Sequence, residues 1–128
     1  MNELILPLTT VVATQAATTD ATEAVVGTVY AIEYRPGTIA TGATLTVTCL
    51  GLDGAEKPLL TKSSAGTADS WYYPRDLVHA VADAVALTGT AGGDRACPIL
   101  QGKVRAVIAS GGTLTVRTGT VVIYWEPL

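Results

Sequence analysis

Phenylalanine is absent from this 128-residue chain, and methionine and histidine each occur only once. Only 15% of the residues are charged, against about 25% in typical soluble domains. The eight basic residues are scattered and the formal net charge is −3, which argues against nucleic-acid binding, because that function needs clustered Lys and Arg. No run of about 20 apolar residues occurs, so we expect no membrane-spanning segment and no membrane partner.

Cysteine is also scarce, and Cys49 and Cys97 allow one disulfide at most. Both lie among apolar residues, and a domain of this length does not need a bridge to fold. We therefore expect two unpaired, buried thiols. The N-terminal segment lacks basic residues and its apolar run is interrupted at Pro7, so we expect no signal peptide and synthesis in the cytoplasm.

Short segments rich in threonine, valine and leucine, separated by glycine and proline, make up most of the chain. Residues 43–52 alternate apolar side chains with threonine, which is typical of a half-buried antiparallel strand. Asp53-Gly54 then predicts a tight hairpin to a partner strand over 56–61. Pro58 cannot donate a backbone hydrogen bond, so this partner is expected at a sheet edge. For the same reason Pro7 favours a sheet edge for any strand over residues 4–14.

Further alternating segments predict strands over 25–34, 103–109, 113–117 and 121–126, with Leu114 and Val116 facing the core. Arg35-Pro36-Gly37 is expected to form a type II turn, and residues 118–120 are expected to turn or kink the chain. Residues 15–24 are expected to form a loop or a short solvated strand. These spacings predict an all-β fold, an antiparallel β-sandwich or jelly-roll-like barrel.

By length the chain is one domain. We expect residues 1–24 to form an N-terminal arm or first strand and residues 25–128 to form a single β-sandwich domain. Residues 70–100 interrupt the strand pattern and are expected to form one long central connection. Within it, residues 76–87 fit a short helix capped by Asp76 and an extended chain equally well.

The central connection contains residue types used in catalysis and metal binding, but in incomplete sets. His79 and Asp83 are spaced as neighbours on a helix, yet a single histidine without a second His or a close Cys makes a poor zinc site. Cys97 could join them in a hydrolase, although no nucleophile signature surrounds it. The glycine-rich segment 89–95 lacks the GK[ST] ending of a phosphate-binding loop. We therefore expect no enzyme activity, no cofactor and no metal.

The same connection holds the residue types that dominate protein interfaces. If the chain is extended at residues 71–73, Trp71 and Tyr73 share one face and Tyr72 points to the other. The candidate interface residues are Trp71, Tyr72, Tyr73, Arg75, His79, Asp94 and Arg95. Stacking of a sugar ring on the aromatic residues is the alternative, in a carbohydrate-binding or adhesion module of β-sandwich type.

Several motifs together resemble a family of small structural proteins of tailed phages. They are GTVYAIEY at 27–34, Tyr-Pro-Arg at 73–75, the single histidine, Asp94-Arg95, and VIASGG at 107–112. The family is encoded beside the major capsid gene and is described as head decoration or cement proteins. The similarity extends from about residue 27 to residue 126.

The resemblance implies a virion protein on the capsid surface that binds the major capsid protein. It also implies a symmetric homo-oligomer, with a trimer favoured, and no catalytic residues. An N-terminal arm over residues 4–14 would then reach a neighbouring subunit by strand addition. A head–tail connector or a tail component is the related alternative.

Overall fold

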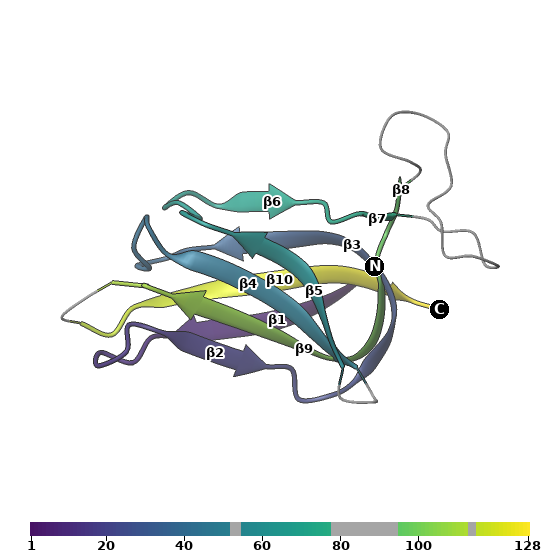
Figure 1. The fold of residues 1–128 in the computed structure, drawn as a ribbon, viewed down its shortest axis with the longest axis horizontal. Coiled ribbons are helices and arrows are strands. Elements are labelled where there is room, and N and C mark those ends of the chain that lie inside the picture. The colour runs from purple at the N-terminus through teal and green to yellow at the C-terminus, as the bar shows by residue number, and fades with distance from the viewer. Residues whose placement is uncertain (52–54, 78–94, 113–114) are drawn as a thin grey trace.

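The computed structural model describes residues 1–51, 55–77, 95–112 and 115–128 (Figure 1). They confirm an all-β, antiparallel, sandwich-like fold, and no helix occurs among them. The strands are β1 (Asn2–Thr9), β2 (Ala17–Asp20), β3 (Val25–Arg35), β4 (Thr44–Gly51), β5 (Glu56–Lys62), β6 (Ser70–Tyr72), β7 (Asp76–Leu77), β8 (Arg95–Ala96), β9 (Ile99–Ala109) and β10 (Thr118–Pro127).

The strands form two layers that are joined at a shared corner. One layer runs β6-β3-β10-β1 and the other runs β2-β9-β4-β5. Val25–Thr28 of β3 pairs with Ile99–Gly102 of β9, which links the layers by backbone hydrogen bonds. On the far side the Thr19 hydroxyl of β2 donates to the Pro7 carbonyl oxygen of β1. β7 and β8 form a separate two-stranded ladder.

The hairpin predicted from the alternating segment 43–52 is confirmed. β4 pairs with β5, and the Gly51 N–H donates to the Ala55 carbonyl oxygen at 2.7 Å where the hairpin closes. β5 lies at the edge of its layer, as Pro58 predicted, and the register shifts next to that proline. A β-bulge at this position lets the strand accept a residue without an N–H.

The segment expected to be an arm or first strand is a strand of the sheet. β1 pairs with β10 from Asn2 opposite Trp125 to Thr9 opposite Thr118. It occupies the edge of the layer, as Pro7 predicted. In this structure β1 therefore completes the sheet of its own chain. The following segment contains the short strand β2, in which Ala17 is buried.

Side chains from both layers fill the space between them. The largest fully buried ones are Leu6, Leu8, Val29, Ile32, Tyr34, Ile39, Leu45, Val47, Leu100, Val104, Ile108 and Ile123. They come from β1, β3, β4, β9 and β10 and from the turn after β3, so the core depends on pairings between distant parts of the sequence. Burial, with a smaller effect of nearby Tyr72, raises the pKa of the Tyr34 hydroxyl to about 12. Tyr34 therefore stays neutral inside the core.

Two predicted turns and one predicted strand were wrong. The turn after β3 starts one residue late, because the Ile39 N–H donates to the Pro36 carbonyl oxygen and Gly37 has a φ of 55°. Residues 115–117 form no strand, and β10 already begins at Thr118, where we expected a turn. Val116, which we expected to face the core, is 56% exposed, and Leu114 lies outside the described residues.

The predicted central connection contains more strand than we expected. β6 joins the edge of β3, and the expected helix cap Asp76 is instead the first residue of β7, paired with Ala96. The remainder of the helix expected over 76–87 lies outside the described residues. Both cysteines are unpaired, as predicted, but only Cys49 is buried, since Cys97 is partly exposed.

Candidate functional site

Four of the seven aromatic residues lie outside the core, Tyr30, Trp71, Tyr73 and Tyr124. The first three are exposed and Tyr124 is partly exposed. The other aromatic residues, Tyr34, Tyr72 and Trp125, pack in or against the core. The register puts Trp71 and Tyr124 on the outer side of the β6-β3-β10-β1 layer, and we call this pair the aromatic face.

Trp71 and Tyr124 stack on each other across β3. The backbone register places Trp71 opposite Glu33 and Tyr124 opposite Ala31. The ring centroids are 5.1 Å apart and the ring planes meet at 26°. The small side chain of Ala31 leaves room for the rings to meet over β3. Trp71 remains 48% exposed, so Tyr124 supports an indole ring that is still accessible from solvent.

A nearly buried carboxylate lies beside the stack. Glu33 is only 7% exposed, and its Oε1 accepts hydrogen bonds from Arg35 Nη2 at 2.7 Å and from the Tyr124 hydroxyl at 3.0 Å. The Arg35 hydrogen bond lowers the pKa of Glu33; burial opposes this shift and the Tyr124 hydrogen bond adds to it. Ionised Glu33 therefore holds the Tyr124 ring under Trp71.

This carboxylate predicts a dependence of stability on pH. The pKa of folded Glu33 lies below the ordinary glutamate value of 4.5, so its stabilising effect is complete above that value. The effect disappears as the pH falls through the folded pKa. We expect Glu33→Gln to lower the melting temperature at about pH 7 and to have less effect near pH 3. Thermal unfolding of both proteins across this range measures the difference, and a difference independent of pH would contradict the assignment.

A hollow of about 490 Å³ lies next to this network on the same layer. Its polar lining includes Arg35, Asp69, Thr9, Thr118 and Thr120. Arg35 also donates to Glu33, so one side chain connects the hollow to the aromatic stack. Together they form a surface that is apolar and flat at one end and polar and recessed at the other.

The structure brings together only some of the predicted interface residues. Trp71 and Tyr73 are exposed, whereas Tyr72 packs against the core, as the alternation predicted. Arg75 Nη1 donates to the carbonyl oxygens of Tyr30 at 3.3 Å and Pro74 at 2.6 Å, so its hydrogen bonds are within the chain.

The structure gives little geometry for the other predicted interface residues, Arg95, His79 and Asp94. The backbone of Arg95 belongs to β8. His79 and Asp94 lie outside the described residues, as do Asp83 and nearly all of the glycine-rich segment 89–95. The structure therefore gives no geometry for a catalytic or metal site built from His79, Asp83 and Cys97.

Sequence reasoning missed Glu33, Arg35 and Tyr124. The alternation of 121–126 did separate Tyr124 from the core-facing residues of its strand, which was a usable signal. However, nothing local indicates that β10 and β6 flank the same strand, so the stack with Trp71 could not be predicted. Glu33 was also unremarkable in sequence, because its burial depends on that stack.

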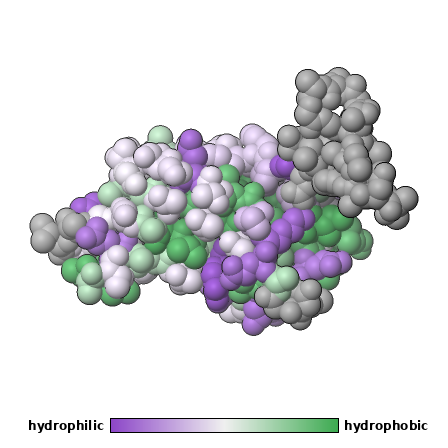
Figure 2. Space-filling view, in the orientation of Figure 1, coloured by the Kyte–Doolittle hydropathy of each residue, from purple (hydrophilic) through white to green (hydrophobic). Residues whose placement is uncertain are grey.

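A second exposed feature lies where the β1–β2 and β9–β10 connections meet. Val11, Val12 and Val116 are all at least 46% exposed, and we call them the valine end. The Thr10 N–H donates to the Arg117 carbonyl oxygen at 2.8 Å, and the Arg117 N–H donates to the Thr10 hydroxyl at 2.9 Å. These bonds hold the two connections together at Thr10 and Arg117. Figure 2 shows hydrophobic surface at this end of the molecule.

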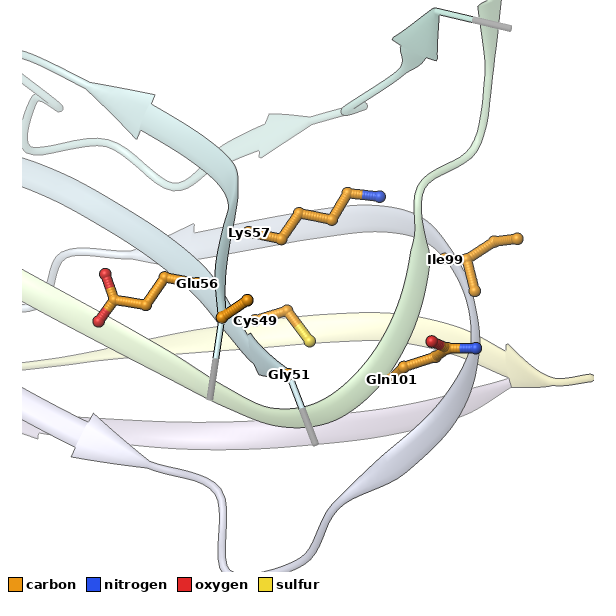
Figure 3. A pocket seen from close by; sticks show the side chains of 7 residues that line it. Cys49, Gly51, Glu56, Lys57, Ile99 and Gln101 are labelled. Carbon is orange, nitrogen blue, oxygen red and sulfur yellow. The ribbon is translucent and has the colours of Figure 1, made fainter. Parts of the chain in front are cut away.

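A third feature is a hollow of about 550 Å³ where β4, β5 and β9 approach one another (Figure 3). The Cys49 thiol lies between the side chains of Lys57 and Gln101, with Ile99 on the same side as Gln101. The lining mixes apolar, amide and charged groups, and we assign it no chemistry.

The part of the chain that the structure describes contains no group of three or more His, Cys, Asp or Glu placed to hold a metal ion. Within that part, no helix has the length and apolarity needed to cross a membrane.

Comparison with known proteins identifies no relative of this chain. No family model matches it, and neither a curated protein nor a solved structure is significantly similar to it. Any function must therefore be argued from the residues and their geometry.

Proposed function

We propose that this chain is a virion structural protein, a decoration subunit that binds the outer surface of a tailed-phage head. The observation that carries the proposal is the valine end, three exposed valines on two connections that are joined by backbone hydrogen bonds. The motifs at 27–34, 73–75 and 107–112, which resemble the decoration family, support the same role. The partner is the major capsid protein.

The geometry of the valine end favours binding to another protein. Val11 also pairs with Ala16, and the Gly111 N–H donates to the Gln15 carbonyl oxygen at 2.7 Å, so both connections are tied together. A pre-ordered surface loses little conformational entropy on binding. Each valine is already partly buried, so burying the remainder contributes roughly 1 kcal/mol. A decoration subunit requires contact of this kind and no catalytic step.

The proposed assembly is a homo-oligomer, with a trimer favoured, placed on the symmetry axes of the shell. Several identical contacts made at once raise the overall affinity well above that of one contact. A modest apolar cluster on each subunit is sufficient under these conditions. A head–tail connector or tail component would use the same surface, the valine end, in a different part of the particle.

Co-sedimentation with empty heads built from the accompanying major capsid protein tests this role. We expect the double variant Val11→Thr/Val116→Thr to bind at least roughly tenfold more weakly, because threonine keeps the shape and removes apolar contact. Val26→Thr is the matched control, since Val26 is 45% exposed on β3 and lies outside the valine end. Equal binding of the double variant and the native chain would overturn the assignment of this surface.

A further inference from the structure

The aromatic face and the hollow lined by Arg35 and Asp69 form a surface that the capsid-binding proposal does not use. The indole of Trp71 is 48% exposed and is supported by its stack with Tyr124. One ring face of Trp71 is covered by Tyr124, so the exposed surface includes the opposite face. A flat aromatic ring of this kind suits the C–H face of a sugar ring.

The polar end of the surface lies at a distance that suits a second sugar ring. Glu33, opposite Trp71, and Arg35, in the hollow, are two residues apart on the same side of β3. The strand rise separates them by roughly 7 Å. Asp69 and the hydroxyl groups of Thr118 and Thr120 line the same hollow and can exchange hydrogen bonds with sugar hydroxyls.

The charges near this surface do not favour an acidic ligand. Arg35 is paired with Glu33 at 2.7 Å, and Asp69 also acts on its charge. Glu3 lies opposite Tyr124 on β1, and Arg75 is held at the Tyr30 carbonyl oxygen. Three carboxylates thus accompany two guanidinium groups. A sialylated or sulfated glycan would find no excess of positive charge.

The distribution of apolar and polar groups also distinguishes a sugar from a protein partner. Protein interfaces have an apolar centre surrounded by a polar rim. Here the aromatic stack and the polar groups of the hollow lie side by side along the strands. An oligosaccharide, with apolar ring faces and hydroxyl edges, matches that arrangement.

We propose that the outer face of the β6-β3-β10-β1 layer binds a neutral oligosaccharide. One sugar ring stacks on Trp71, and the next occupies the hollow lined by Arg35 and Asp69. The site would give a virion protein a second attachment, to glycans, that is separate from its contact with the capsid.

Titration of the intact protein with maltohexaose, cellohexaose and N-acetylchitohexaose tests the proposal, with sialyllactose as the acidic comparison. Calorimetry gives the affinity, and a fluorescence change present in the native chain but absent in Trp71→Ala separates Trp71 from Trp125. We expect at least one neutral oligosaccharide to bind with a Kd below about 10 mM and sialyllactose to bind more weakly. Absence of binding by all three neutral sugars, or stronger binding of sialyllactose, would overturn it.

Two variants locate the site. Trp71→Ala should weaken binding by roughly tenfold or more, and Asp69→Asn, at an exposed position, should weaken it without disturbing the stack. Val12→Thr, at the valine end, is the control and should bind sugar normally. Unchanged binding by both Trp71→Ala and Asp69→Asn would contradict the site. The assay contains no capsid, so its failure is distinguishable from failure of the capsid-binding proposal.

Discussion

Replacement of Gly102 by alanine is expected to destabilise the protein by more than about 3 kcal/mol or to prevent folding. Gly102 has a φ of 147°, and a Cβ built on it would lie 1.9 Å from the Leu50 carbonyl oxygen. That oxygen belongs to the backbone, so it cannot move aside as a side chain could. Gly102 pairs with both Val25 and Gly51, at the corner that joins the two layers. Denaturant unfolding measures the loss.

Two other glycines provide controls for this prediction. A Cβ at Gly42 would meet no atom within 4 Å, so Gly42→Ala should leave stability nearly unchanged. Gly66 has equally open surroundings but a φ of 87°, so Gly66→Ala should cost only about 1 kcal/mol of backbone strain. If Gly102→Ala were as mild as either control, the close approach of β9 and β4 would not be a constraint on the fold.

Leu8→Ala is expected to destabilise the protein by about 2–5 kcal/mol, the usual range for truncating a fully buried leucine. Leu8 has no exposed surface and lies in β1, within the segment that the sequence allowed to be an arm. A large loss shows that β1 belongs to the core of its own chain. The free energy of unfolding from denaturant titration is the relevant quantity.

Ile5→Ala is the matched control, because Ile5 lies in the same strand but is 60% exposed on the outer side. We expect a change within about 0.5 kcal/mol for this variant. Similar, small effects of both substitutions would contradict the placement of β1 in the sheet and would support an arm that packs elsewhere.

Local patterns predicted the parts of the fold that depend on neighbouring residues. The alternation in 43–52 and the turn at Asp53-Gly54 gave the β4–β5 hairpin, because strand, turn and partner are consecutive. Pro7 and Pro58 identified two edge strands, since a residue without an N–H is excluded from the centre of a sheet. The all-β class followed from the same signals.

Contacts between distant residues could not be predicted in this way. The Trp71–Tyr124 stack requires both β6 and β10 to pair with β3, and no short motif encodes that arrangement. Burial of Glu33 follows from the same arrangement. The error at Val116 is of the opposite kind. The alternation in 113–117 predicted a core position for this side chain, which is 56% exposed.

The two proposed surfaces give the chain one contact to a shell and one to a glycan. The valine end lies on connections joined by backbone hydrogen bonds, and the Trp71–Tyr124 stack lies on paired strands. The valine end depends on apolar burial, whereas the aromatic face combines stacking with hydrogen bonds. Substitutions at one surface should therefore leave the other intact.

A cryo-EM map of phage heads that carry this protein tests the central claim most directly. The proposed role predicts density for this sandwich on the outside of the capsid, repeated around its symmetry axes, with the valine end facing the major capsid protein. Density restricted to the neck or tail, or absence of the protein from the particles, would contradict it.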